Sequence, residues 1–188
     1  MGDFFLRALG TLFLCGLCFF SWGASTDALK RPMVIHKVTA LGLEIWTEAN
    51  PEWEARLEFR NSQPVFIAET PALSTPPAGM SWAANPGIEF SAGEMSDGAR
   101  GAMQQAAWNY GSQDWNRLEL RPASYGDLAG YETFFPGVAY GMPVDVRMFC
   151  GHQPGKRAVV MHAFTLRGKL GQISEHVRRS WTHVRYLR

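Results

Sequence analysis

In the second half of the chain, the spacing of apolar residues changes from every second residue to every third or fourth residue. This change constrains the fold more than any other feature. Apolar residues occupy every second position from Val144 to Cys150, and the stretch Ala158–Leu166 is apolar on both faces. A period of two predicts strands, and a strand that is apolar on both faces is typical of the centre of a sheet. The spacing then becomes helical, with an apolar stripe made of Leu170, Ile173, Val177, Trp181 and Val184. We therefore expect an α+β fold in which helices pack on a single antiparallel sheet.

Shorter apolar segments in the rest of the chain fit the same class. The expected strands are Met33–Ala40, Leu43–Thr47, Arg56–Phe59, Val65–Ala68 and Tyr131–Phe135. A helix is expected from Asp97 to Tyr110, where apolar residues recur at a spacing of three to four. Prolines at positions 71, 76, 77 and 86 predict a long exposed loop from Thr70 to Pro86.

The N-terminal segment has the features of an export leader. The uncharged run Ala8–Phe20 is followed by small residues that suit cleavage after Gly23 or Ser25. Because Asp3 offsets Arg7 before this run, an uncleaved membrane anchor is the alternative, and it would be the chain's contact with a membrane. We expect export to the bacterial periplasm.

Length and composition set the domain organisation. A chain of 188 residues with 46% hydrophobic and 19% charged residues suits one globular domain. We expect a signal peptide over residues 1–25 and one α+β domain over residues 26–188. Cleavage would leave Cys150 as the single cysteine, which we expect to be buried and unable to form an internal disulfide.

The order of segments in the C-terminal half carries a family resemblance. A helix ending near Trp108 is followed by the strand start Leu128-Ala129-Gly130-Tyr131-Glu132, by two long hairpin strands, and by a helix ending in Ser180-Trp181-Thr182-His183-Val184. Over about residues 106–187 this order resembles the PsbP/Mog1-like superfamily, including bacterial DcrB-like envelope proteins. The resemblance implies a PsbP/Mog1-like fold, no shared catalytic residues, and a binding or assembly role with a protein partner.

Charge is distributed unevenly along the sequence. From Glu44 to Asp145 there are 14 acidic and five basic residues, a net charge of −9, whereas Met148–Arg188 has eight basic residues and one acidic residue, a net charge of +7. The two parts can neutralise each other, or the basic part can meet an acidic envelope protein or an anionic membrane surface. The formal net charge of +1 argues against a nucleic-acid partner. The candidate contact residues are Arg167, Lys169, Arg178, Arg179 and Arg185.

Motifs for known chemistry are missing from the sequence. It has no G-x-S-x-G, P-loop, dinucleotide-binding or H-E-x-x-H motif, and its C-x-x-C lies inside the apolar leader. His176 and His183 are two helical turns apart, about 10.5 Å, which is too far for one metal ion. We therefore expect neither a metal nor a cofactor. His162 alternates with Val160 and Phe164, which predicts a hydrogen-bonded polar group in or beside the core.

Two function hypotheses follow. The leading one is an exported, non-enzymatic protein-binding factor, either an envelope accessory protein or an immunity protein that blocks a toxin. In this hypothesis Trp53 and Trp82, which have no periodic place in the expected core, join the basic contact residues. The alternative is a periplasmic hydrolase or small-ligand-binding protein with an acid/base pair near Glu119 and Glu132. A deep pocket with convergent groups of perturbed pKa would favour the alternative.

Overall fold

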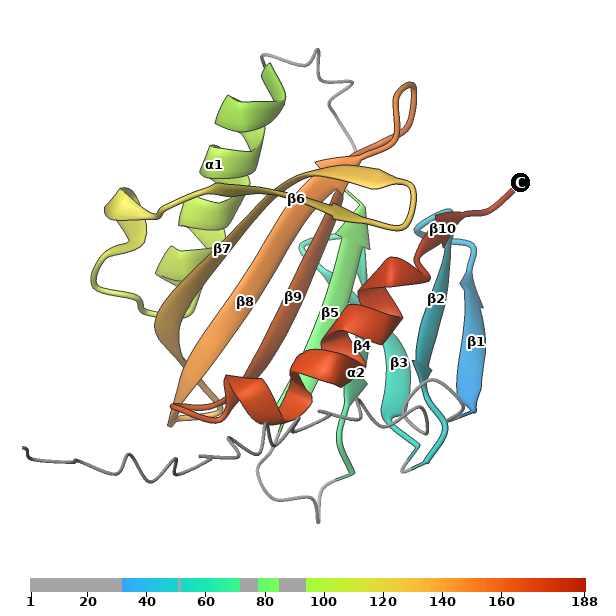
Figure 1. Ribbon diagram of the computed structural model, residues 1–188, viewed down its shortest axis with the longest axis horizontal. Coiled ribbons are helices and arrows are strands. Elements are labelled where there is room, and N and C mark those ends of the chain that lie inside the picture. Colours follow the sequence, from blue (N-terminus) through green and yellow to red (C-terminus); the bar gives the residue numbers. More distant parts are fainter. Residues whose placement is uncertain (1–31, 51, 72–77, 85–93) are drawn as a thin grey trace, which may run out of the picture. The chain divides into compact units, whose positions relative to one another are not determined.

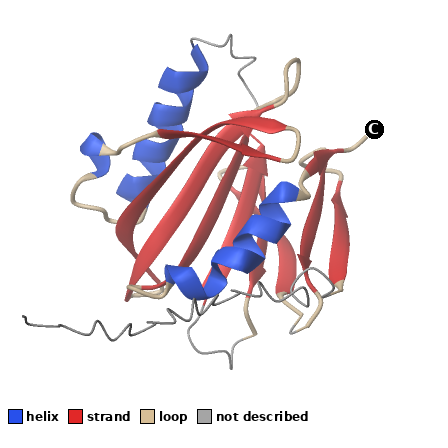
Figure 2. Ribbon diagram, in the orientation of Figure 1, coloured by secondary structure: helices blue, strands red, loops and turns tan. Residues whose placement is uncertain are grey.

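The period-two segments of the sequence form the strands of two antiparallel sheets (Figures 1 and 2). The computed structural model describes residues 32–50, 52–71, 78–84 and 94–188, so the predicted leader and its cleavage sites lie outside the described residues. The elements are β1 (Met33–Val38), β2 (Leu43–Glu48), β3 (Glu54–Arg60), β4 (Gln63–Glu69), β5 (Ala78–Ala84), α1 (Glu94–Asn109), the 3₁₀ helix η2 (Trp115–Arg117), β6 (Arg121–Tyr125), β7 (Leu128–Ala139), β8 (Met142–His152), β9 (Val159–Leu166), α2 (Leu170–Thr182) and β10 (Arg185–Tyr186).

The larger sheet has seven strands in the order β3-β4-β5-β9-β8-β7-β6. Every neighbouring pair is antiparallel, and β9 lies at the centre, as its two apolar faces predicted. The smaller sheet has the order β1-β2-β10. The α+β class is thus confirmed, whereas the single sheet of the prediction is in fact two sheets.

One strand of the larger sheet was missed by the sequence analysis. Residues 78–84, which we expected within an exposed loop, form β5 and pair with both β4 and β9. The prolines at 76 and 77 precede this strand and do not interrupt it. Met80 and Trp82 alternate with Ser81, and both are buried, with 1% and 0% of their surface exposed. Their alternation is the period-two signal that the proline-rich surroundings concealed.

The two faces of the larger sheet pack against different elements. The α2 face is the face that carries Phe66, Trp82, Met161 and Phe149, which are register partners on β4, β5, β9 and β8. Helix α2 and the smaller sheet pack against it, and the predicted stripe of Ile173, Val177 and Trp181 is buried there. Together these side chains form the larger of the two hydrophobic clusters.

The α1 face is the opposite face, which carries Ile67, Ser81, His162 and Met148 on the same four strands. Helix α1 packs on β7 and β8 through Met103 and Ala107, which join Val146 and Met148 in the second hydrophobic cluster. The helix therefore covers mainly the β7–β8 side of this face (Figure 1). The β4, β5 and β9 side is where the candidate site lies.

Candidate ligand-binding site

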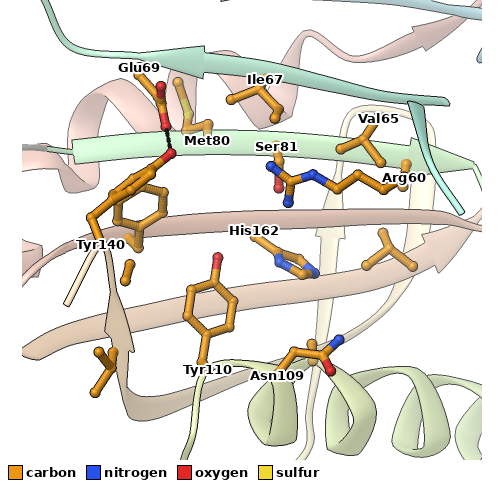
Figure 3. A pocket seen from close by; sticks show the side chains of 16 residues that line it. Arg60, Val65, Ile67, Glu69, Met80, Ser81, Asn109, Tyr110, Tyr140 and His162 are labelled. Carbon is orange, nitrogen blue, oxygen red and sulfur yellow. Dashed lines mark hydrogen bonds between the residues drawn. The ribbon is translucent and has the colours of Figure 1, made fainter. Parts of the chain in front are cut away.

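A cavity of about 340 Å³ lies on the α1 face, beside the C-terminal end of α1. One wall is formed by strands β4, β5 and β9, and the opposite wall by α1 and the β7–β8 hairpin (Figure 3). This volume falls within the range of small-molecule sites in proteins, about 300–1,000 Å³. Helix α1 contacts β7 and β8, and the cavity lies next to it, where β4, β5 and β9 form the other wall.

Apolar side chains supply much of the cavity wall. Val65 and Ile67 project from β4, and Val160 and Phe164 from β9. The ring of Phe164 depends on Gly79, because a Cβ at that position would lie 2.5 Å from the Phe164 ring. Apolar walls of this kind favour a ligand with an apolar body.

Three polar side chains converge on the cavity between these apolar groups: Ser81 from β5, Tyr110 from the end of α1, and His162 from β9 (Figure 3). The rings of Tyr110 and His162 lie 5.9 Å apart between centroids. None of the three side chains has a hydrogen-bond partner among the described residues. The alternation around His162 predicts a hydrogen-bonded side chain; the structure instead leaves its ring nitrogens available to a ligand.

Tyr110 is held in position by its backbone and by a glycine on β7. The amide of Val138 donates a hydrogen bond to the Tyr110 carbonyl, with an N···O distance of 2.7 Å. A Cβ at Gly137 would lie 2.7 Å from the Tyr110 Cβ, so only glycine permits this close approach. Gly111, with φ of +65°, then turns the chain away from the helix. The phenol therefore points into the cavity (Figure 3).

Burial shifts the pKa values of His162 and Tyr110 in opposite directions. It lowers the pKa of His162 to about 4, and the nearby positive charge of Arg60 acts in the same direction. Burial also raises the pKa of Tyr110 to about 12. Both side chains are consequently neutral near pH 7, and each can donate one hydrogen bond and accept another.

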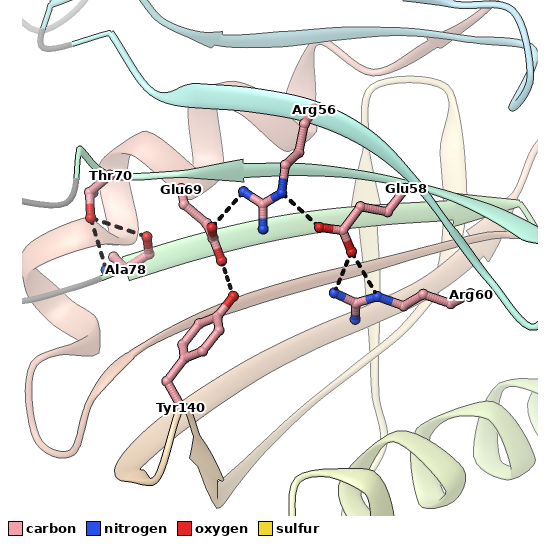
Figure 4. Close-up of polar contacts among 7 residues, drawn as sticks. All are labelled: Arg56, Glu58, Arg60, Glu69, Thr70, Ala78 and Tyr140. Carbon is pink, nitrogen blue, oxygen red and sulfur yellow. Dashed lines mark hydrogen bonds and ion pairs between the residues drawn. The ribbon is translucent and has the colours of Figure 1, made fainter.

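A network of charged residues borders the cavity (Figure 4). Glu58 pairs with Arg56 at 2.7 Å and with Arg60 at 3.0 Å, and the two arginines lower the pKa of its carboxyl. Glu69 pairs with Arg56 at 2.7 Å and accepts a hydrogen bond from the hydroxyl of Tyr140. The charges at the rim are therefore already neutralised in pairs.

Tyr140 closes one end of the cavity from an unusual backbone conformation. It occupies the turn between β7 and β8 together with Gly141, and both have positive φ, +52° and +72°. This conformation suits a two-residue hairpin turn but is costly for a bulky side chain. The hydrogen bond to Glu69 and the ring contact with Phe164 hold Tyr140 over the cavity.

The structure places three of the predicted contact residues in the interior. Trp82 and Trp53 are 0% and 3% exposed, and Arg179 is 6% exposed. Their proposed contact with a partner is therefore wrong, because Trp53 and Trp82 belong to the larger hydrophobic cluster and Arg179 is buried against Glu48. The Arg179 Nη1 lies 2.8 Å from the Glu48 carboxylate, and His176 Nδ1 lies 3.1 Å from the same oxygen. Arg179 lies outside the apolar stripe of α2, so the sequence predicts an exposed side chain, whereas the structure buries it.

The other predicted contact residues are exposed. Arg178 pairs with Glu175 at 2.7 Å, and Arg167 pairs with Asp145 at 3.2 Å. Lys169 and Arg185 form no ion pair with any residue that the structure describes. Some of the predicted contact residues are therefore neutralised within the chain, and their contact with a partner stays a prediction.

The two residues of the predicted acid/base pair, Glu119 and Glu132, form ion pairs with different arginines. Glu132 accepts hydrogen bonds from Tyr125 at 2.6 Å and from Arg147 at 2.8 Å. Glu119 is exposed and pairs with Arg121 at 3.1 Å, which lowers the pKa of its carboxyl. The two carboxylates therefore belong to separate ion pairs.

The remaining candidates for chemistry are also accounted for by the structure. Cys150 is buried, as expected, and burial raises the pKa of its thiol to about 12. A thiol with this pKa is a poor nucleophile at neutral pH. Within the described ranges no group of three or more His, Cys, Asp or Glu side chains is placed to hold a metal ion.

Most of the cavity residues were not singled out from the sequence. Ser81 and Tyr110 lie in segments that were assigned to a loop and to a helix face, and Arg60, Glu69 and Tyr140 were not considered. Two signals were present in the sequence. Ser81 lies between the large apolar residues Met80 and Trp82, and Tyr140-Gly141 lies between two strands with alternating apolar residues. These signals predict strands and turns, but they do not predict which strands are neighbours.

The comparisons with known proteins identify similar folds only. No protein-family model matches the chain, and no curated protein matches it. The resemblance to the PsbP/Mog1-like superfamily thus stays a prediction.

Three solved structures are similar to this one. A protein of Bacteroides thetaiotaomicron matches with a TM-score of 0.50 and 10% identity, over 82% of this chain and 48% of its own. The chain therefore spans about half the length of that protein. PA94 of Pseudomonas aeruginosa, a protein of unknown function, matches with a TM-score of 0.47 and 10% identity, over 80% of this chain and 94% of its own. LpqN of Mycobacterium tuberculosis, involved in cell envelope biogenesis, matches with a TM-score of 0.45 and 9% identity, over 78% and 83%.

The described helices are short and amphipathic. None of them has the length and apolar character needed to cross a membrane.

Proposed function

We propose that this chain is an exported binding protein that holds a small, uncharged ligand in the cavity on the α1 face. The observation that carries this proposal is the convergence of Ser81, Tyr110 and His162, all without hydrogen-bond partners among the described residues, in a largely apolar cavity. Polar groups inside proteins are normally hydrogen-bonded, so three unpaired groups facing one cavity favour a ligand that pairs with them.

The chemistry of the wall defines the ligand class. His162 and Tyr110 are neutral near pH 7, and the rim charges of Glu69 and Arg60 are already paired. A charged ligand would have to compete with these ion pairs, whereas an uncharged one would not. We infer a ligand with an apolar body and a hydroxyl or amide group that both donates and accepts hydrogen bonds.

The proposed role is binding without catalysis. The groups in the cavity lack an activated nucleophile: Ser81 has no hydrogen bond to His162, and Cys150 lies in the core with a raised pKa. The carboxylates that could act as acid and base, Glu119 and Glu132, are held by arginines.

The test uses small probes and a cavity-filling variant. Phenol and benzamide are titrated into the ¹⁵N-labelled protein, and amide chemical shifts are measured. We expect shifts for both probes at residues around Ser81, Tyr110 and His162. Ser81→Phe should abolish them by filling the cavity. Ser124→Phe places the same side chain at an exposed position of β6 and should leave them unchanged. Probe binding that is equal in the two variants, or absent in the wild type, would reject the cavity as the site.

Binding of an acidic envelope protein is the second candidate function. Lys169 and Arg185 are exposed and form no ion pair with the described residues, and they lie in the part of the sequence with a net charge of +7. The proposal predicts a partner that co-purifies at low salt and is lost at moderate salt. Exchanging Lys169 and Arg185 for glutamate should abolish this co-purification, and unchanged binding would rule out these two residues as the contact site.

A further inference from the structure

Strand β3 is the outer edge of the seven-stranded sheet. Its residues pair with β4, and the structure describes no strand on its other side. The strand is seven residues long, and all of its side chains except Glu58 are exposed. Its outer backbone N–H and C=O groups therefore form a row that another strand can pair with.

The two faces of β3 carry different side chains. On the α2 face are Ala55, Leu57 and Phe59, and the last two are 42% and 67% exposed. On the α1 face are Arg56, Glu58 and Arg60, which form the ion pairs at the rim of the cavity. An edge strand that exposes a leucine and a phenylalanine lacks the protection that edge strands normally have on that face.

The sequence of β3 is complementary to itself when it is read in the opposite direction. In Glu-Ala-Arg-Leu-Glu-Phe-Arg, the charged residues at equal distances from Leu57 carry opposite charges. Glu54 matches Arg60, and Arg56 matches Glu58. Opposite charges that face each other across antiparallel strands stabilise the pair, and like charges destabilise it.

We propose that two copies of this chain associate through β3, antiparallel, with Leu57 of one copy opposite Leu57 of the other. On the α1 face, this register places Glu54 opposite Arg60 and Arg56 opposite Glu58 at both ends. On the α2 face it places Leu57 against its counterpart and Phe59 against Ala55. The interface is isologous, because the same strand contributes from both copies.

The charges select this register over its neighbours. Centring the pair on Glu58 would place Arg56 opposite Arg60 and Glu58 opposite itself. Centring it on Arg56 would place Glu54 opposite Glu58 and Arg56 opposite itself. Since side chains alternate between faces, a shift of the centre by one residue changes these pairings on the charged face from unlike to like.

The dimer joins the two larger sheets into one continuous sheet. The two-fold axis is perpendicular to the sheet, so the α1 faces of both copies lie on the same side, and so do both cavities. The association does not require the proposed ligand, because it uses the backbone and side chains of β3. Its area is small, so we expect an affinity in the micromolar range, as for a weak reversible interface.

The experiment is a charge exchange measured by sedimentation velocity. The chain is expressed from its full-length sequence and studied from about 5 to about 200 µM, as wild type and as the variants Arg56→Glu and Glu58→Arg. We expect a dimer in the wild type and a dissociation constant at least about tenfold larger in each variant, because each places like charges opposite each other. An equimolar mixture of the two variants restores every unlike pair, so it should dimerise with an affinity near that of the wild type.

Two further variants serve as controls. The double variant Arg56→Glu/Glu58→Arg restores complementarity within one chain and should dimerise, even though it changes the ion pair with Glu69. Arg121→Glu changes an exposed arginine on β6, the opposite edge of the sheet, and should leave the dimer intact. A wild type that stays monomeric at the highest concentration, a dimer that persists in both single variants, or a mixture that fails to dimerise would each overturn the proposal.

Discussion

The two faces of the seven-stranded sheet are built from the same strands but differ in how completely they are covered. On the α2 face, the smaller sheet and α2 bury a continuous layer of large side chains that includes Trp82 and Phe149. On the α1 face, one helix covers β7 and β8, and polar side chains such as Ser81 and His162 occupy the remaining strands. The comparison indicates that the α2 face is fully covered by buried side chains, whereas the α1 face combines a smaller hydrophobic cluster with an open cavity.

Removing a large side chain from the covered face should have the largest effect. We expect Trp82→Ala to lower the free energy of unfolding by about 3–5 kcal/mol, because it leaves a cavity beside Phe66, whose ring lies 5.7 Å from that of Trp82. Urea unfolding followed by circular dichroism measures the change. A loss below about 1 kcal/mol would contradict the assignment of this face as the main source of stability.

The buried ion pair behind the same face should come next. Arg179→Met leaves the buried Glu48 carboxylate with His176 as its one remaining ion-pair partner among the described residues, so we expect a loss of about 3 kcal/mol. The double variant Glu48→Gln/Arg179→Met removes both charges and should recover most of this loss. Chemical denaturation of the two variants and the wild type decides the point. Equal losses in the single and double variants would show that the charge itself is unimportant.

On the α1 face, the stability should depend on pH through His162. Its pKa is about 4 in the folded chain, against an ordinary value of 6.5. Above pH 6.5 both states are neutral; as the pH falls from 6.5 to 4, the unfolded chain binds the proton first. The free energy of unfolding should therefore fall by up to about 3 kcal/mol over this range. His162→Gln should show a smaller decrease in urea unfolding curves recorded from about pH 7 to about pH 4.5. Parallel decreases in both proteins would disprove this role.

The smallest effect is expected for the residue next to Trp82. Ser81→Ala removes a hydroxyl that has no hydrogen-bond partner among the described residues, so the free energy of unfolding should change by less than about 0.5 kcal/mol. Thermal unfolding by differential scanning fluorimetry tests this prediction. Adjacent residues would then differ roughly tenfold in their effect on stability because they lie on opposite faces. A loss above about 1 kcal/mol would show that the α1 face also contributes to stability at this point.

The sequence predicted those features that depend on local periodicity. The apolar stripe of α2 and the two apolar faces of β9 were sufficient to predict a terminal helix and a central strand. Strand β5 was missed because prolines dominate the segment before it, although Met80 and Trp82 alternate. Helical spacing alone did not predict the surroundings of Trp108, which is 60% exposed and contacts Trp115 edge-on.

The candidate site was beyond the reach of the sequence for a different reason. Its polar residues, Ser81, Tyr110 and His162, come from three separate segments, and they meet only because β5 and β9 are neighbours while α1 ends beside them. Local patterns specify which face of a strand is apolar, but the pairing of distant strands specifies which side chains meet. The buried ion pair of Glu48 with Arg179 is non-local in the same way.

The carboxylate of Glu69 connects the cavity on the α1 face with the edge strand β3. It accepts a hydrogen bond from Tyr140 at the end of the cavity and pairs with Arg56 on the edge strand β3. A ligand that displaces Tyr140 removes one of the two contacts of the Glu69 carboxylate, and so changes how Glu69 holds the Arg56 side chain at the edge. By thermodynamic reciprocity, whatever ligand binding does to association through β3, association must do to ligand binding by the same factor. Under the two proposals, the shared side chain of Glu69 would therefore couple occupancy of the cavity to association through β3.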